Sequence, residues 1–310
     1  MIEFDAPAAV PAGFGPSAVT IGKFDGVHLG HREIIAQLRT VAASRSLASA
    51  VVTFDRNPLA TVQPERCPAS LTGTAQKRDL LAETGVDASL VLRFDRAMAE
   101  QSPEDFVREI LVDALHARAV LVGQDFRFGH RGRGDTEMLA RMGSEHGFEL
   151  VVIPDVAPEQ GRRVSSTWVR ELLAEGDVAA AARLLGRPHA VRGEVVHGAK
   201  RGRELGFPTA NLEPSSQGFI PADGVYAGWL EARGVRYAAA ISVGNNPTFE
   251  GVPQKQVEAN LPGVEVDLYG AIAEIEFVER IRGMVAFAGI EPLIAQMGAD
   301  VRRMHEILGV

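Results

Sequence analysis

The stretch Val19-Thr-Ile-Gly-Lys-Phe-Asp-Gly-Val-His-Leu-Gly-His31 decides the fold of the first half of this chain. An apolar run stops at Gly22, a turn follows, and from Gly30 onward apolar residues recur at helical spacing. This order predicts a buried strand, a tight loop and an amphipathic helix. His28 and His31 stand three residues apart where the helix is expected to begin, so both rings can lie on one face of it.

The expected loop has the properties of a phosphate site. The start of a helix attracts phosphate because its first N–H groups have no partner within the helix. Gly26 and Gly30 let a ligand approach the backbone closely, and two imidazoles can donate hydrogen bonds to charge that develops in a transition state. The alternative is that the two histidines are solvated surface groups in an ordinary loop.

Composition indicates a cytoplasmic protein of two domains. A length of 310 residues exceeds a typical single domain, and 46% hydrophobic with 23% charged residues is typical of globular proteins. The net charge of −8 argues against a nucleic-acid partner, which would need a basic surface. We expect no secretory signal, no membrane span of roughly 20 apolar residues, and no internal disulfide from the lone Cys67.

Strand-like and helix-like segments alternate over the first 185 residues. After the first strand and helix, strands are expected at 50–54, 89–94, 119–123 and 149–154, and helices at 74–82, 102–115, 135–142, 166–174 and 177–185. Such alternation predicts a parallel sheet covered on both faces. Ligands of these sheets bind beyond the carboxyl ends of the strands.

The pattern changes at Gly186-Arg-Pro188, which breaks the last helix and marks the expected boundary between domains 1–186 and 187–310. Beyond it, short strands are expected at 189–197, 224–232, 235–243, 254–261 and 271–281. Short strands separated by Gly, Pro and Asn turns predict a small barrel or sandwich. The chain closes on a helix whose apolar residues, from Ile290 to Leu308, share one face that we expect to belong to the core.

A second glycine-containing stretch, Val122-Gly-Gln-Asp-Phe-Arg-Phe-Gly129, follows the strand expected at 119–123. The rings of Phe126 and Phe128 can pack on a flat ligand, and Arg127 can meet a phosphate. A solvated basic turn is the other interpretation.

The segment Val164-Ser-Ser-Thr-Trp-Val-Arg170 begins a predicted helix. Ser165, Ser166 or Thr167 can cap that helix, and capping alone explains the hydroxyl groups. Arg170 adds a planar guanidinium that can bind two phosphate oxygens.

The strongest signal in the chain is Val196-His-Gly-Ala-Lys-Arg-Gly-Arg-Glu-Leu-Gly-Phe-Pro-Thr-Ala-Asn-Leu212. A phosphate can lie against Gly198 and Lys200, and the turn that follows offers oxygens of Thr209 and Asn211 to a hard cation such as Mg²⁺. No GxxxxGK[ST] sequence is present, so this is not a Walker loop.

Taken together, these motifs resemble a known family. Gly-x-Phe-Asp-Gly-x-His-x-Gly-His resembles the HxGH signature of nucleotidylyltransferases, in the longer form found in bacterial bifunctional riboflavin kinase/FAD synthetases. Ser-Ser-Thr-x-x-Arg resembles the second signature of these adenylyltransferases, and Arg-Gly-Arg-x-Leu-Gly-Phe-Pro-Thr-Ala-Asn resembles the riboflavin kinase signature. The resemblance implies a Rossmann-like N-terminal domain and a six-stranded C-terminal β-barrel that ends on a helix.

The resemblance also implies site residues in both domains. For the adenylyltransferase these are the catalytic groups His28, His31 and Arg170, ATP contacts at Gly22, Phe24, Asp25, Gly26, Gly30, Ser165, Ser166 and Thr167, and FMN contacts at Asn57, Asp125, Phe126, Arg127 and Phe128. For the kinase they are the base Glu258, the Mg²⁺ ligands Thr209 and Asn211, and ATP or flavin contacts at Gly198, Lys200, Gly202, Phe207, Pro208, Tyr226, Asn246 and Arg282.

The implied function is flavin cofactor synthesis: riboflavin and ATP give FMN, and FMN and ATP give FAD and pyrophosphate. Small molecules are the expected partners, and the protein is expected to be a monomer or a transient homo-oligomer. The chain departs from the family pattern at Asn57, where the family often has His, and at Asn260 and Pro262. The alternatives are a riboflavin kinase with a weak or inactive N-terminal domain, a flavin carrier, and a tRNA-directed HxGH enzyme.

Overall fold

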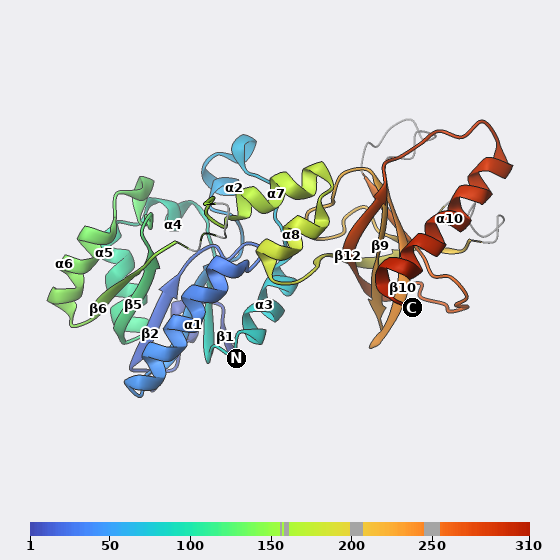
Figure 1. The fold of residues 1–310 in the computed structure, drawn as a ribbon. Helices are drawn as coiled ribbons and strands as arrows, with labels where there is room; N and C mark the ends of the chain where they lie inside the picture. The colour runs from blue at the N-terminus through green and yellow to red at the C-terminus, as the bar shows by residue number, and fades with distance from the viewer. Residues whose placement is uncertain (156, 158–160, 199–206, 245–254) are drawn as a thin grey trace. The chain divides into compact units, whose positions relative to one another are not determined.

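The computed structural model describes residues 1–155, 157, 161–198, 207–244 and 255–310. The chain divides into two compact units (Figure 1). Residues 1–70 and 74–164 form the N-terminal unit, and residues 71–73 and 165–310 form the C-terminal unit. Within the described residues, no helix is both long and apolar enough to cross a bilayer.

The N-terminal unit is built on a parallel sheet of six strands with the order β1-β4-β3-β2-β5-β6. The strands are β1 (Ile2–Phe4), β2 (Ser17–Ile21), β3 (Ala48–Phe54), β4 (Ala88–Leu92), β5 (Ala117–Gly123) and β6 (Glu149–Ile153). The predicted parallel sheet is thereby confirmed, and the structure adds the short strand β1. Because β3 and β5 flank β2, the loops after β2 and β5 lie where the strand order reverses, which is where sheets of this type bind ligands.

Helices cover both faces of this sheet. One core cluster joins Ala18 of β2 to apolar residues of α1 (Leu29–Ser44) and α3 (Thr74–Glu83). The other joins Val19 and Ile21 to α5 (Pro103–Phe106), the helical segment η3 (Val107–Ala114) and α6 (Thr136–His146). Successive residues of β2 thus point into opposite cores. Shorter helical elements are η1 (Pro7–Ala9), α2 (Leu59–Val62), η2 (Pro64–Arg66), α4 (Arg96–Glu100) and η4 (His130–Gly132).

The C-terminal unit contains a closed antiparallel barrel of six strands, in the order β10-β11-β8-β7-β12-β9. The strands are β7 (His189–Val196), β8 (Thr209–Leu212), β9 (Gly224–Ala232), β10 (Val235–Gly244), β11 (Gln256–Asn260) and β12 (Ile272–Arg282). This confirms the barrel. It corrects the assignment of residues 209–212, which form strand β8 and not a turn, because β11 and β7 supply their ladder partners.

Two helices, α7 (Ser166–Glu175) and α8 (Val178–Leu185), belong to the C-terminal unit. The apolar residues of α8 are buried, and the helix contacts β7 and β12 of the barrel. The compact units therefore divide between Val164 and Ser165. The boundary expected between residues 186 and 187 stays a prediction.

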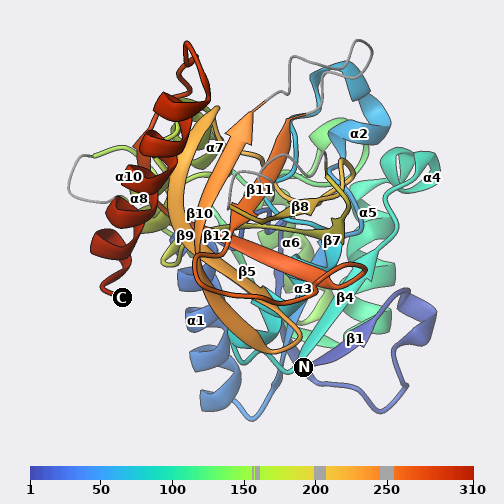
Figure 2. The same cartoon turned by 90° about the vertical axis from the view of Figure 1, so that its right-hand side faces the viewer.

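The last helix, α10 (Ile290–Leu308), lies along β9 and β10 (Figure 2). Met304, in its second half, is buried in a cluster with Ala227 and Ala240. Ile290, in its first turn, is 63% exposed. The expectation of a continuous core face thus holds for the second half of the helix only, since Ile290 and Ile294 in the first half are exposed.

Candidate active sites

The loop after β2 is tightly wound. Phe24, Gly26 and Val27 have φ values of 48°, 81° and 40°, in the left-handed region that non-glycine residues seldom adopt. The side chains of Phe24 and Val27 are buried in the core, and this packing holds the strained backbone in place. The loop is therefore a rigid connection that delivers the chain to the start of α1.

The two histidines lie together at the start of α1, as their spacing predicted. His28 is the N-cap of the helix, and its Nδ1 accepts a hydrogen bond from the backbone N–H of His31 at 3.4 Å. The two rings stack with centroids 3.7 Å apart and an interplanar angle of 14°. A Cβ at Gly30 would lie 3.2 Å from the His28 ring, so the absence of a side chain there leaves room for the stack.

His31 is held in its neutral form. Burial lowers its pKa well below the usual value, and His28, Arg163, Lys23 and Lys77 lower it further. Its Nδ1 is buried and has no hydrogen-bond partner among the described residues. A proton on that atom would be an unsatisfied buried donor, so the neutral ring carries its proton on Nε2. His28 also carries no proton on Nδ1, which leaves an Nε2–H donor on each ring.

Lys77 is not among the residues predicted from the sequence, although its positive charge helps to lower the pKa of His31. It comes from α3, and its Nζ donates a hydrogen bond to the carbonyl oxygen of Phe54 at 2.6 Å, at the carboxyl end of β3. The sequence held a usable signal, because Lys77 stands at helical spacing from the buried Leu80 and Leu81 and so shares the sheet-facing side of α3.

The loop after β5 is held by ion pairs. Asp125 pairs with Arg163, which also pairs with Asp155 at 3.2 Å. Arg127 pairs with Asp135 at 3.3 Å. The two charged residues among the predicted FMN contacts, Asp125 and Arg127, have exposed side chains whose charges are partly offset by these partners.

The aromatic residues of the same loop differ in exposure. Phe128 is buried in the core with Phe106, and its ring stacks on that of Phe126 at 5.5 Å. Phe126 is half-buried and so keeps part of its ring open. Asn57 lies in the turn between β3 and α2, where it accepts a hydrogen bond from the backbone N–H of Leu59 at 3.1 Å.

The second signature lies at the start of α7. Ser165 is the N-cap, and its Oγ accepts a hydrogen bond from the N–H of Trp168 at 3.2 Å. Ser166 is half-buried and Thr167 is exposed in the first turn, and Arg170 is half-buried in the next. Capping is therefore confirmed for Ser165.

In the C-terminal unit, strands β8 and β11 carry four polar residues on one face of the barrel wall. Three of them, Glu258, Thr209 and Asn211, are predicted site residues. The fourth is Asn260, where the chain departs from the family pattern. Glu258 is directly opposite Asn211, and Asn260 is opposite Thr209. The intervening pair points to the other face, because strand residues alternate. Asn211 Nδ2 also lies 3.2 Å from Thr209 Oγ1. The predicted base and both predicted metal ligands thus come together.

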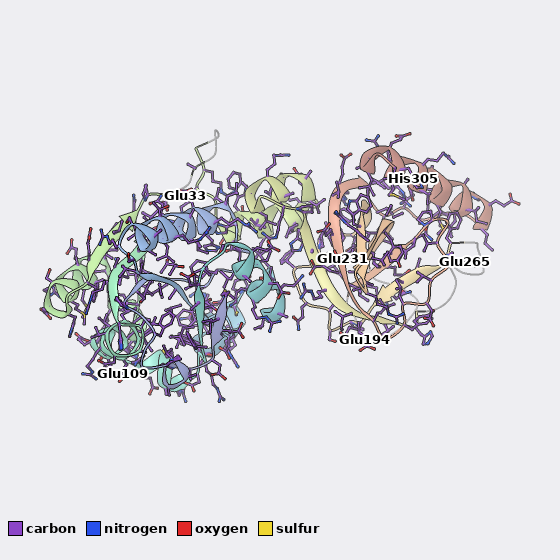
Figure 3. All side chains as sticks on the ribbon, turned by 90° about the horizontal axis from the view of Figure 1, so that it is seen from below. Glu33, Glu109, Glu194, Glu231, Glu265 and His305 are labelled. Carbon is purple, nitrogen blue, oxygen red and sulfur yellow. The ribbon has the colours of Figure 1, made fainter. Side chains whose placement is uncertain are left out.

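This wall borders a cavity of about 810 Å³. A Cβ at Gly198 would lie 2.5 Å from the Asn211 side chain, so only glycine fits there. At the cavity, the ring of Tyr269 lies 3.7 Å from that of His197. The lining residues are Val195, Gly198, Pro208, Thr209, Ala210, Asn211, Leu261, Val264, Glu265, Val266, Asp267, Leu268 and Tyr269, of which Glu265 is labelled in Figure 3.

The variant residue Asn260 has a definite structural role. It is 6% exposed, and its Nδ2 donates to the carbonyl oxygen of Pro208 at 2.8 Å. It therefore fixes the backbone immediately before Thr209. Its Oδ1 is buried without a hydrogen-bond partner among the described residues.

The remaining kinase predictions fall in different environments. Tyr226 is fully buried, donates its hydroxyl to the carbonyl oxygen of Ala222, and has a pKa raised by burial. Arg282 pairs with the buried Asp300 of α10 at 2.7 Å. Phe207 is half-buried. The predicted site residues Lys200, Gly202 and Asn246 lie outside the described residues.

Comparison with known proteins covers nearly the whole chain. Residues 12–168 match the family model described as FAD synthetase, and residues 185–308 match that described as Riboflavin kinase. A protein of Escherichia coli (strain K12), named bifunctional riboflavin kinase/FMN adenylyltransferase, is 39% identical over 94% of this chain and 93% of its own length. A protein of the same name from Listeria monocytogenes is 36% identical over 91% of this chain and 89% of its own length.

Among solved structures, a crystal structure of a protein named macrolide-efflux protein from Streptococcus pneumoniae superposes with a TM-score of 0.88. It is 31% identical in sequence and covers 98% of both chains. The two-part architecture therefore occurs as a whole in that solved protein.

Proposed function

The chain belongs to the bifunctional riboflavin kinase/FMN adenylyltransferase family, and we propose how its residues divide the two reactions between them. Riboflavin and ATP give FMN and ADP in one reaction, and FMN and ATP give FAD and pyrophosphate in the other. The observation that carries this function is the presence of both family domains in one chain that spans nearly the full length of its bifunctional relatives. It favours two activities over a kinase alone.

In the kinase reaction, Glu258 accepts the proton of the riboflavin 5′-hydroxyl as that oxygen attacks the γ-phosphorus of ATP. A new P–O bond forms, the bond to the β–γ bridging oxygen breaks, and ADP leaves with that electron pair. The position of Glu258 directly across the strand from Asn211 supports this role. The cavity along the same wall offers room for the nucleotide.

The oxygens of Thr209 and Asn211 fit Mg²⁺, which prefers oxygen ligands and usually takes one or two from the protein beside those of the phosphates. The described residues hold no group of three or more His, Cys, Asp or Glu side chains that could hold a metal ion by themselves. We infer that Mg²⁺ arrives with ATP, and when bound it neutralises phosphate charge. Asn260 supports the arrangement by fixing Pro208 next to Thr209.

In the adenylyl transfer, a phosphate oxygen of FMN attacks the α-phosphorus of ATP and pyrophosphate leaves. The attacking phosphate is already ionised, so no protein base is needed. The Nε2–H groups of His28 and His31 donate hydrogen bonds to the developing charge, and Arg170 with the hydroxyls at the start of α7 binds the leaving phosphates. The stacking of the two rings and the neutral state in which burial holds His31 support this assignment.

We further infer a cytoplasmic enzyme that acts on small molecules, as a monomer or transient homo-oligomer, with its adenylyltransferase in residues 1–186 and its kinase in residues 187–310. ATP as the substrate of both reactions supports the location, and the net charge of −8 argues against a nucleic-acid substrate.

The test is to incubate the purified protein with riboflavin, ATP and Mg²⁺ and to separate the flavins over time. FMN followed by FAD is expected. FMN alone would refute the adenylyltransferase assignment, and the absence of both products would leave a flavin carrier. The variant His28→Ala should make FMN at the unchanged rate and no FAD, and equal loss of both products would refute the division between the two domains.

A further inference from the structure

The side chain of Lys77 on α3 is half-buried, in the same unit as the histidine pair. Its Nζ reaches the carboxyl end of β3 and donates to the carbonyl oxygen of Phe54 at 2.6 Å. A lysine on an exposed helix would keep its ammonium group in water. Here the side chain instead runs toward the place where the sheet is expected to bind its ligand.

A short chain of contacts connects Lys77 to the strained loop. Nζ lies 3.5 Å from Thr53 Oγ1, and the same hydroxyl donates to the carbonyl oxygen of Lys23 at 3.2 Å. Thr53 is fully buried. Lys23 immediately precedes Phe24, where the left-handed backbone begins. The ammonium group therefore braces the end of β3 against the loop that delivers the two histidines.

Lys77 also contributes charge. Burial lowers its pKa, whereas the carboxylates of Asp25 and Asp55 raise it and so favour the charged form. The same positive charge is one of those that lower the pKa of His31. The groups that act on His31 come from three parts of the unit: His28 and Lys23 from the loop, Lys77 from α3, and Arg163 from the segment after β6.

We propose that Lys77 is a positioning residue of the adenylyltransferase, which braces the histidine-bearing loop through Thr53 and keeps a fixed positive charge beside His31. The inference rests on the proposed function of this unit. Lys77 neither gains nor loses a proton in the reaction. Its charge favours the phosphate groups of both substrates and keeps His31 a neutral hydrogen-bond donor as the bond between α-phosphorus and pyrophosphate breaks.

The first test compares three full-length variants. Lys77→Met removes the charge but keeps most of the length, Lys77→Arg keeps the charge, and Arg78→Met is a matched control that removes an exposed cation from the same helix. FAD formation from FMN and ATP is measured beside FMN formation from riboflavin in the same sample, so that the kinase rate reports the amount of folded protein.

Lys77→Met is expected to lower kcat for FAD formation by about 10- to 100-fold, less than the roughly 100- to 1000-fold lost with a donor that itself touches the developing charge, with a smaller change in KM for ATP. Lys77→Arg should recover most of that loss, and Arg78→Met should match the wild type. Wild-type FAD formation by Lys77→Met would overturn the proposal. So would equal losses in Lys77→Met and Lys77→Arg, which would indicate a purely steric role.

The second test does not depend on turnover. The His31 ring is titrated by NMR in the wild type and the variants, with its resonance assigned from the spectrum of His31→Gln. Loss of the Lys77 charge should raise the pKa of His31, and Lys77→Arg and Arg78→Met should leave it unchanged. An unchanged pKa in Lys77→Met would overturn the electrostatic part of the proposal. If the wild type makes no FAD, the proposed function fails, whereas this titration still decides whether Lys77 acts on His31.

Discussion

Replacing Gly30 by Ala would separate the stability of α1 from the position of the His28 ring. Gly30 is the second residue of α1, and its φ lies outside the left-handed region, so alanine can adopt its backbone conformation. In a helix interior, alanine is favoured over glycine by about 1 kcal/mol, and the gain near a terminus is smaller. The helix itself should therefore tolerate the substitution.

The new Cβ would, however, lie 3.2 Å from Cε1 and Nδ1 of His28, closer than an ordinary van der Waals contact. The ring must shift by a few tenths of an ångström, away from its stack on His31 and from the hydrogen bond that caps α1. Because misplacement of a reacting group by about 1 Å can cost about 100-fold in rate, we expect FAD formation to fall by about tenfold. The free energy of unfolding should change by less than about 1 kcal/mol.

The assay measures FAD formation from FMN and ATP, FMN formation from riboflavin, and thermal unfolding. Gly298→Ala is the matched control, since it lies within α10 and its new Cβ would meet only the end of the Arg302 side chain, at 3.6 Å. It should stabilise the protein and change neither rate. Wild-type FAD formation by Gly30→Ala would refute the argument that the position of the His28 ring determines the rate.

Three further predictions concern the C-terminal unit. Glu258→Gln should lower FMN formation by about 100-fold or more, because the base is lost, and leave adenylylation of supplied FMN unchanged; loss of both rates would contradict its role. Asp300→Asn should lower the free energy of unfolding by about 2 kcal/mol, since it breaks the largely buried pair with Arg282, and an unchanged urea midpoint would argue against this. Burial lowers the pKa of His189 to about 4 from 6.5. The unfolded chain then binds more protons, so stability should fall as pH drops from about 6.5 to about 4, by at most about 3 kcal/mol. His189→Asn should flatten this dependence in urea unfolding, and the same slope in both proteins would contradict it.

The sequence predicted features that depend on local patterns. The strand, loop and helix around His28 follow from an apolar run, glycines and helical spacing, and all of these act within a few residues of one another. The same holds for the N-cap at Ser165, where a hydroxyl precedes an apolar helix. The placement of His28 and His31 on one face likewise follows from their separation of three residues at a helix start, whereas the stacking of their rings is seen only in the structure.

Features that depend on distant partners were not predictable in this way. The run Pro208-Thr-Ala-Asn211 has the residue types of a turn, yet residues 209–212 form β8 because β11, far along the chain, provides a ladder. Phe128 resembles a ligand contact in sequence, but η3 and α5 bring Phe106 against it. For Lys77 the sequence offers only its helical spacing from Leu80 and Leu81, and the fold is needed to show that its ammonium group reaches β3.

The packing of α7 and α8 on the barrel has a practical consequence for dividing this protein into fragments. A kinase fragment that begins at residue 187 would lack α8 and open the barrel surface that Leu184 and Leu185 help to cover. It would also remove the carbonyl oxygen of Glu175, which accepts a hydrogen bond from Arg280 of β12. A fragment that begins at Ser165 keeps both. Fusion or truncation designs should therefore cut the polypeptide between Val164 and Ser165. The N-terminal fragment made by this cut would lack α7, the helix that bears Arg170.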